Sequence, residues 1–213
     1  MSEILCVYDN VKLGTDVILG EFCVIGRMPK PVKSIKKDLF LQEEQVTIGD
    51  GTVICPHVVI YAGVTLGKRV LIGDQSSVFC RVTIGDDVLI SRNVTINSDT
   101  EIGDGSRVMD NSHVTGRCRI GKNVFVGAGV VMANDSNFGK QGYNEECMGP
   151  QIEDDVCIGS GAVLLPRIRI GKGSVVAAGS VVKKNVAPGM VVSGNPARTI
   201  GEAKLLFGTV DNS

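Results

Sequence analysis

The chain has 213 residues, a net charge of −1 and only 4 % aromatic residues, with no Trp. This length allows one or two domains, and the shortage of large rings argues against an ordinary globular core. No stretch reaches the roughly 18 apolar residues of a membrane span, and the first ten residues lack both a basic start and an apolar run. We therefore expect a soluble, cytoplasmic protein that does not insert into a membrane.

A period of six residues runs through most of the chain. Aliphatic residues recur at this spacing over 7–25, and aliphatic residues or Met recur without a break over 48–132 and again over 152–182. An α-helix has a period of 3.6 and a simple strand a period of 2, so neither explains the pattern. Short strands joined by sharp turns and wound into a coil do explain it.

Glycine follows the aliphatic residue at every third repeat. Three hexads therefore make one turn of a three-sided prism, with 18 residues per turn. We expect glycine here because it tolerates backbone angles at a bend that other residues avoid. The glycines of this series are Gly49, Gly67, Gly85, Gly103 and Gly121.

Two interruptions break the repeat, over 27–47 and 133–151. The first contains Pro29, Pro31 and five basic residues, which could hold a nucleotide diphosphate. The second is polar, rich in glycine and acidic, and a coil does not require it. Loops of this length are uncommon unless they are functional or disordered. We expect both to be extruded loops, and the second either to contribute to a site or to be a tolerated insertion.

The C-terminal part of the chain is basic. Residues 160–213 contain seven basic and two acidic residues, which favours a phosphorylated ligand over an ordinary solvated surface. Few aromatic residues lie among these bases, so nucleic acid is not expected. Pro188 should end the regular coil, and Glu202 to Phe207 could form a short closing helix. The predicted division is one domain over 1–200 and a cap or tail over 201–213.

The seven cysteines form no C-x-x-C pair, so we expect reduced core residues and no metal site. The hexads, together with the closing segments Gly179–Val182 and Gly194–Arg198, resemble the hexapeptide-repeat acyltransferases. The resemblance implies an all-β fold: a single left-handed parallel β-helix with three hexads per coil, two extruded loops and a short C-terminal helix. Left-handedness comes from the resemblance alone, since crossovers between parallel strands are generally right-handed.

Members of this family are homotrimers that bind acyl-CoA between neighbouring prisms. The resemblance implies acetyl-CoA as the co-substrate, with its pantetheine arm on the backbone of late coils and its phosphates near the basic C-terminal segment. Basic side chains suit this position, because their hydrogen bonds to phosphate are charge-assisted. The residues carried over to the cofactor are Gly159, Ala177, Ala178, Lys183, Lys184, Pro196 and Arg198.

Within the family, the segments 108–114 and 120–127 are most similar to the nucleotide-amino-sugar N-acetyltransferases. Those enzymes acetylate amino sugars linked to UDP, dTDP or GDP, and often have an uncharged Asn-rich segment here. This chain instead has Asp110-Asn111-Ser112-His113, which adds a carboxylate and an imidazole. The resemblance implies transfer of acetyl to the amino group of such a sugar. O-acetylation of a sugar or another small hydroxyl acceptor, or a serine-type acceptor, stays open.

Acyl transfer needs a base that removes a proton from the attacking group, and histidine suits this role. The chain has two, His57 and His113. The 18-residue turn places His113 beneath Met132, where the second loop leaves the coil, so His113 is the better candidate. Asp110 could orient it or bind the acceptor amine, and Asn111 could hold the acceptor. Residues of the second loop that could bind substrate are Asn134, Asp135, Phe138 and Tyr143.

Two rival functions fit the sequence less well. A zinc carbonic anhydrase on the same coil needs three histidine ligands, and two histidines on different rungs do not favour it. A non-catalytic structural trimer needs neither the polar loops nor the cofactor-type ending.

Overall fold

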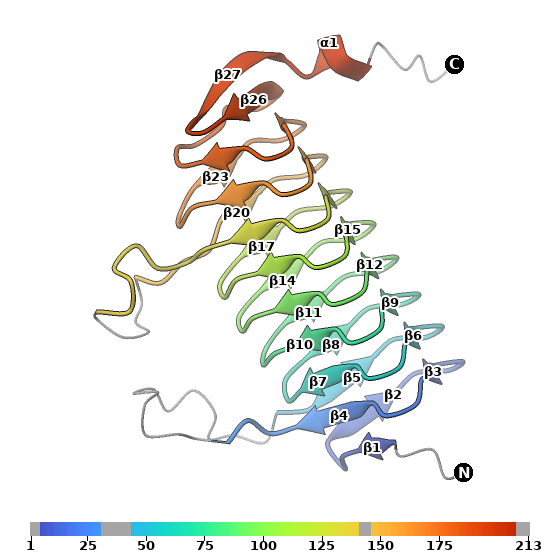
Figure 1. Cartoon of the computed structure of the whole chain (residues 1–213). Helices are drawn as coiled ribbons and strands as arrows, with labels where there is room; N and C mark the ends of the chain where they lie inside the picture. Colours follow the sequence, from blue (N-terminus) through green and yellow to red (C-terminus); the bar gives the residue numbers. More distant parts are fainter. Residues whose placement is uncertain (1–4, 31–43, 141–145, 208–213) are drawn as a thin grey trace, which may run out of the picture.

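Three sheets of very short strands form the sides of a prism (Figure 1). The computed structural model describes residues 5–30, 44–140 and 146–207. Within these ranges the sheets, here named A, B and C, contain nine, eight and ten strands. The chain visits A, B and C in turn, and all pairs but one are parallel. This confirms the predicted all-β fold, a left-handed parallel β-helix.

Each coil except the last contributes one strand to each side. Sheet A comprises β1 (Cys6–Val7), β4 (Val24–Arg27), β7 (Val59–Tyr61), β10 (Ser77–Val78), β13 (Thr95–Ile96), β16 (His113–Val114), β19 (Val131–Met132), β22 (Val163–Leu164) and β25 (Val181–Val182). Sheet B comprises β2 (Val11–Leu13), β5 (Val46–Ile48), β8 (Thr65–Leu66), β11 (Thr83–Ile84), β14 (Glu101–Ile102), β17 (Arg119–Ile120), β20 (Gln151–Ile152) and β23 (Arg169–Ile170).

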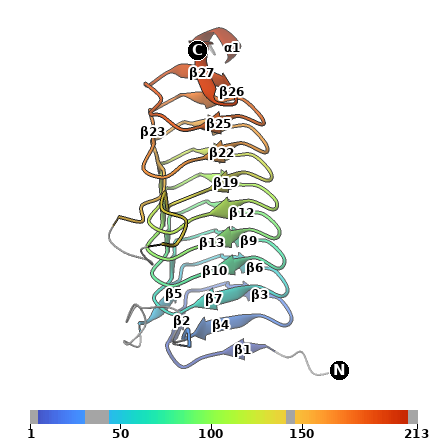
Figure 2. The same cartoon turned by 60° about the vertical axis from the view of Figure 1, so that its left-hand side comes forward.

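Sheet C carries the C-terminal end of the molecule as well as one side of the prism. It comprises β3 (Ile18–Leu19), β6 (Val53–Ile54), β9 (Leu71–Ile72), β12 (Leu89–Ile90), β15 (Arg107–Val108), β18 (Phe125–Val126), β21 (Cys157–Ile158), β24 (Val175–Val176), β26 (Met190–Gly194) and β27 (Ala197–Glu202). Figure 2 shows the strands of sheet A rising one above another, with β27 and α1 (Lys204–Phe207) at the far end.

The hexad position that is always aliphatic or Met points into the prism. From Ile25 onwards these side chains are buried, and they form one continuous core with the small residues four positions later. Hydroxyl groups inside the prism are satisfied between coils: Ser76 Oγ donates to Ser91 O over 2.8 Å and accepts from Val94 N over 3.0 Å. Burial of each Val, Ile or Leu contributes about 1.5–3 kcal/mol.

The 18-residue turn is visible in the register of the sheets. Ser77 pairs with Thr95, and Thr95 with His113. The spacing between paired residues exceeds 18 across the two interruptions of the repeat, for example where Ile25 pairs with Ile60 and where Ile120 pairs with Ile152. Each interruption comes after a strand of sheet A and before a strand of sheet B, so both loops leave the same corner of the prism.

Both predicted loops are slightly shorter than expected. The coil continues to Arg27 and resumes at Val46, and after Met132 it resumes at Gln151. Residues 31–43 and 141–145 of these loops lie outside the described residues. The described part of the second loop projects from the prism on the left of Figure 1.

The expected reason for the glycine series was wrong. None of the five glycines of this series has a left-handed φ angle. Instead, a Cβ on Gly49 would lie 2.4 Å from Gly67 O, so glycine permits close contact between coils. The left-handed angles fall two residues later, for example at Arg69 (φ 55°) and Asp87 (φ 58°).

The C-terminal end is closed by a hairpin that the hexad pattern did not predict. The strand β26 follows Pro188 and pairs in parallel with β24, so sheet C continues for one more rung. The last strand, β27, then runs antiparallel to β26, with a cis Asn195–Pro196 peptide in the turn. The predicted closing helix is present as α1. Within the described ranges, no helix is long and apolar enough to cross a membrane.

Candidate functional site

The candidate base, His113, lies on the outer surface of sheet A. Its neighbour Val114 points inward and is fully buried, whereas the imidazole is half-buried on the outside. His113 pairs with Thr95 on one adjacent coil and with Val131 on the other. The second loop leaves directly after β19, which contains Val131. The predicted position of His113, one coil below the root of this loop, is therefore confirmed.

A side-chain hydrogen bond holds the imidazole ring. Nδ1 of His113 lies 2.7 Å from Oγ1 of Thr95. Burial lowers the pKa of His113, because desolvation disfavours the charged imidazolium. A neutral ring can accept a proton, so this environment suits a general base.

The two other catalytic candidates lie in the turn before His113, at the corner between sheets C and A. Oδ1 of Asp110 accepts from Nε of Arg92 over 2.8 Å, and this bond lowers the pKa of the carboxyl group. Asn111 is exposed and has a left-handed φ of 60°. The structure thus pairs Asp110 with Arg92, while Nδ1 of His113 faces Thr95.

At the root of the second loop, Asp135 organises the backbone. Its carboxylate oxygens accept from the N–H groups of Asn137 and Gly139, each over 2.6 Å, and these bonds lower its pKa. Asn134 Nδ2 reaches Gly116 O at 3.4 Å. Phe138 is 92 % exposed. The fourth substrate candidate, Tyr143, lies outside the described residues.

A small polar cavity lies beside this root. Its volume is about 170 Å³. Sequence reasoning did not single out Arg167, which lines it and donates through Nε to Glu146 O over 2.9 Å. The 18-residue spacing could have identified Arg167, because this residue lies at the same corner of the prism as the second loop, one coil above it. The lining residues are Asp135, Ser136, Asn137, Glu146, Cys147 and Arg167.

Three successive turns between sheets C and A contain only Gly, Ala and Ser, and we call them the small-residue corner. They are 127–129, 159–161 and 177–179. The apex glycines, Gly129, Gly161 and Gly179, have left-handed φ angles of 66–69° and open space where a Cβ would stand. Earlier coils place larger side chains at the same apex, namely Phe22, His57, Gln75, Asn93 and Asn111.

The upper two turns of this corner are exposed at residues 160–161 and 178–179. Three of the predicted cofactor residues, Gly159, Ala177 and Ala178, lie in it. Among the hydrogen bonds of the described residues, the N–H groups of Ser160 and Ala178 have no acceptor. A ligand that lies along the corner could therefore pair with these two main-chain donors.

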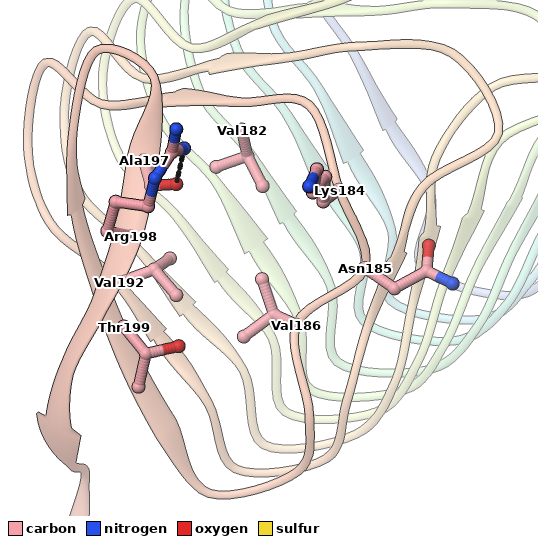
Figure 3. A pocket seen from close by; sticks show the side chains of 8 residues that line it. All are labelled: Val182, Lys184, Asn185, Val186, Val192, Ala197, Arg198 and Thr199. Atoms are coloured by element: carbon pink, nitrogen blue, oxygen red, sulfur yellow. Dashed lines mark hydrogen bonds between the residues drawn. The ribbon is translucent and has the colours of Figure 1, made fainter.

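The remaining cofactor candidates gather at the C-terminal end of the prism. Lys184 and Arg198 both line a cavity of about 210 Å³ with an apolar floor of valines (Figure 3). Nη1 of Arg198 donates to the carbonyl of Ala197 over 3.0 Å. Among the described residues, neither Lys184 nor Arg198 forms an ion pair, so two positive charges of the lining are available to a ligand. Lys183 is exposed and Pro196 is partly buried in the β26–β27 turn, but neither lines the cavity.

Sequence reasoning missed two polar residues of this cavity, Asn185 and Thr199. Each directly follows a predicted cofactor residue in the chain. The seven cofactor candidates thus divide between the small-residue corner and this end of the prism. Across the ranges 5–30, 44–140 and 146–207, no group of three or more His, Cys, Asp or Glu side chains could hold a metal ion.

The match to a family model decides the classification. The model described as bacterial transferase hexapeptide (six repeats) matches residues 45–80, 81–115, 99–134 and 149–184, more than half of the chain. The chain belongs to this family. Its repeats are the same hexads that form the three sides of the prism.

Sequence relatives match shorter segments of the chain. Over 49 residues the chain is 63 % identical to the 2,3,4,5-tetrahydropyridine-2,6-dicarboxylate N-acetyltransferase of Clostridium perfringens (strain SM101 / Type A). This segment makes up 23 % of the chain and 21 % of that enzyme, so the match spans about a fifth of the relative.

Solved structures share the fold over longer stretches. The Arabidopsis UDP-N-acetylglucosamine acyltransferase matches 93 % of this chain and 72 % of its own, with a TM-score of 0.63 and 20 % identity. A point mutant of perosamine N-acetyltransferase from Caulobacter crescentus, in complex with CoA and GDP-perosamine, matches 60 % of this chain and 54 % of its own. Its TM-score is 0.51 and its identity 25 %.

Proposed function

We propose that this chain is an acetyltransferase that moves an acetyl group from acetyl-CoA to a small amine. The arrangement on sheet A carries the proposal: a half-buried, hydrogen-bonded histidine stands between the small-residue corner and the root of the second loop. Two N-acetyltransferases among the similar proteins support it, one of them in complex with CoA.

In this proposal acetyl-CoA lies along the small-residue corner. Main-chain N–H groups at Ser160 and Ala178 are available to the amide groups of its pantetheine arm. Phosphate groups at the C-terminal end would meet Lys184 and Arg198, which make charge-assisted hydrogen bonds with such oxygens. Acetyl-CoA is a substrate in this scheme, and no metal takes part.

His113 acts as the general base. The amine attacks the thioester carbonyl, and His113 takes the proton that the amine loses as the new bond forms. Collapse of the tetrahedral intermediate breaks the carbon–sulfur bond, and the imidazolium returns its proton to the sulfur of CoA. The products are the acetylated amine and free CoA thiol.

For the acceptor we favour a nucleotide-linked amino sugar. The acetyltransferase that was solved in complex with GDP-perosamine supports this class. The match to a dicarboxylate N-acetyltransferase favours a second class, a small amino dicarboxylate or its cyclic imine, although it covers about a fifth of that enzyme. An O-acetyltransferase is a third candidate.

The proposal also includes a homotrimer as the functional assembly.

A screen of acceptors with acetyl-CoA tests these classes together. Free thiol release, with mass spectrometry of the product, is measured for UDP-, dTDP- and GDP-linked amino sugars, amino dicarboxylates, and hydroxyl acceptors including serine. With the best acceptor, His113→Ala should lower kcat by about 10²–10⁴-fold and leave acetyl-CoA binding unchanged. His57→Ala is the matched control, because His57 is an exposed histidine that stacks on Phe22 far from the second loop.

Three results would contradict the proposal. Near-full turnover of His113→Ala would rule out the base assignment. Thiol release only with hydroxyl acceptors would move the function to O-acetylation. The absence of both turnover and thermal stabilisation by millimolar acetyl-CoA would favour a non-catalytic structural protein, since a ligand at 100 times its Kd adds roughly 2.7 kcal/mol.

A further inference from the structure

The hydroxyl group of Thr95 forms a hydrogen bond with the His113 ring. These residues occupy equivalent positions on adjacent coils, β13 and β16, and pair directly in the register of sheet A. Adjacent parallel strands lie about 4.8 Å apart, which brings Oγ1 of Thr95 to 2.7 Å from Nδ1 of His113. The fold itself therefore fixes which ring nitrogen faces the threonine.

The direction of this hydrogen bond determines what the other nitrogen can do. A neutral imidazole carries one proton, on Nδ1 or on Nε2. If Nδ1–H donates to Thr95, Nε2 keeps a lone pair and can accept a proton. If the threonine donates instead, Nε2 carries the proton and cannot act as a base. The donating Nδ1–H bond also survives when His113 becomes an imidazolium, because both nitrogens are then donors.

We propose that Thr95 is a positioning residue: its hydroxyl oxygen accepts from Nδ1–H of His113 and keeps Nε2 free to take the proton of the acceptor. This inference rests on the proposed function, in which His113 is the base. It does not depend on which acceptor is correct, and it assigns Thr95 no direct contact with either substrate.

The test combines a spectroscopic signature with kinetics in the full-length protein. Nitrogen-15 NMR of the His113 ring should show the proton on Nδ1 in the wild type and a shift toward the Nε2–H tautomer in Thr95→Val, which is similar in shape but has no hydroxyl. With an active acceptor, Thr95→Val should lower kcat about 2- to 10-fold, with KM for acetyl-CoA within about twofold. Thr95→Ser should restore both tautomer and rate.

A matched control separates this effect from a general cost of Thr→Val on the surface. Thr83 occupies the same outward position on sheet B, where it pairs with Thr65 and Glu101. Thr83→Val should change neither the His113 spectrum nor kcat. An equal loss of rate in both variants would overturn the positioning role.

The spectra distinguish failure of this inference from failure of the proposed function. A wild-type ring with its proton on Nε2, or a spectrum that is unchanged in Thr95→Val, overturns the role of Thr95 even if the protein is an active acetyltransferase. A wild-type protein that transfers no acetyl group overturns the proposed function, and the spectra still decide how Thr95 holds the ring.

Discussion

The half-buried ring of His113 should titrate below the ordinary histidine range. Burial lowers its pKa in the folded chain, whereas the unfolded value is about 6.5. Between the two values the unfolded chain binds more protons, so stability should rise with pH across that window. The contribution of His113 to the free energy of unfolding is fully present above pH 6.5 and is lost as the pH falls through the pKa of the folded chain.

An NMR titration of the His113 ring measures this pKa directly. The acid limb of kcat/KM should follow the same value if His113 is the base. In His113→Gln, which does not titrate, the part of the stability slope below pH 6.5 that His113 contributes should disappear. A folded pKa at or above 6.5 would contradict the prediction and would show that the ring is better solvated than the structure implies.

The positions of residues relative to one another could be predicted from the sequence, because residues 18 apart lie on adjacent coils in the same sheet. An 18-residue spacing places His113 one coil below the root of the second loop, as the pairing with Val131 shows. The same spacing could have identified the ion-pair partner of Asp110, because Arg92 lies 18 residues before it. Arg69 and Asp87 form an ion pair at the same spacing. The Thr95–His113 pair has this spacing too, but a hydrogen bond depends on side-chain rotamers, which the period does not specify.

At the scale of elements, the sequence predicted the strands and failed at the C-terminal hairpin. Every strand from β5 to β25 follows the six-residue repeat. The repeat therefore predicts both where each strand lies and which of its side chains point into the prism. After Val182 the next inward residue is Val186, where an isolated bridge to Ile170 replaces a full strand. The six-residue repeat therefore ends before Val186. The antiparallel pairing of β26 with β27 does not follow this repeat, so the sequence pattern could not predict it.

The second loop should be separable from the coil. Removal of residues 135–148 joins Asn134 to Gly149 and leaves Met132 and Ile152 six residues apart, which restores one hexad. Gly149 would then occupy the corner position where Arg167 has a left-handed φ of 62° on the next coil, and glycine tolerates this angle. Pro150 is already buried, and its carbonyl accepts from Arg119 N over 3.2 Å.

The shortened chain should keep its circular dichroism spectrum and its binding of acetyl-CoA, because neither the coil nor the small-residue corner is altered. Turnover of the acceptor should be lost if the loop holds it, and the loop variant Phe138→Ala should show a partial loss. Full turnover without the loop would exclude its residues from the acceptor site.

At the scale of the whole molecule, the three outer surfaces differ in chemistry. Sheet B presents mainly charged or polar side chains, with ion pairs between coils such as Arg119–Glu101. Sheet C presents an apolar column interrupted by Arg107, and sheet A presents small or β-branched residues around His113. The outward residues of sheet C are Ile18, Val53, Leu71, Leu89, Arg107, Phe125, Cys157 and Val175. Ile18, Leu71 and Phe125 of this column are exposed, and contiguous exposed apolar surface is typical of protein–protein contacts.

We predict that the wild-type protein is a trimer that buries the outer surface of sheet C. Light scattering coupled to size exclusion should give about three times the chain mass of 22.5 kDa. Phe125 is 41 % exposed in the single chain, and Phe125→Arg should reduce this mass, because a buried arginine without a partner costs several kcal/mol.

Thr83→Arg adds the same charge to the exposed outer surface of sheet B and should leave the trimer intact. Because both side chains point away from the core, neither variant should alter the circular dichroism spectrum. A monomeric wild type would contradict a trimer outright. Dissociation by Thr83→Arg alone would place the contact on the charged surface of the prism and separate it from the apolar column.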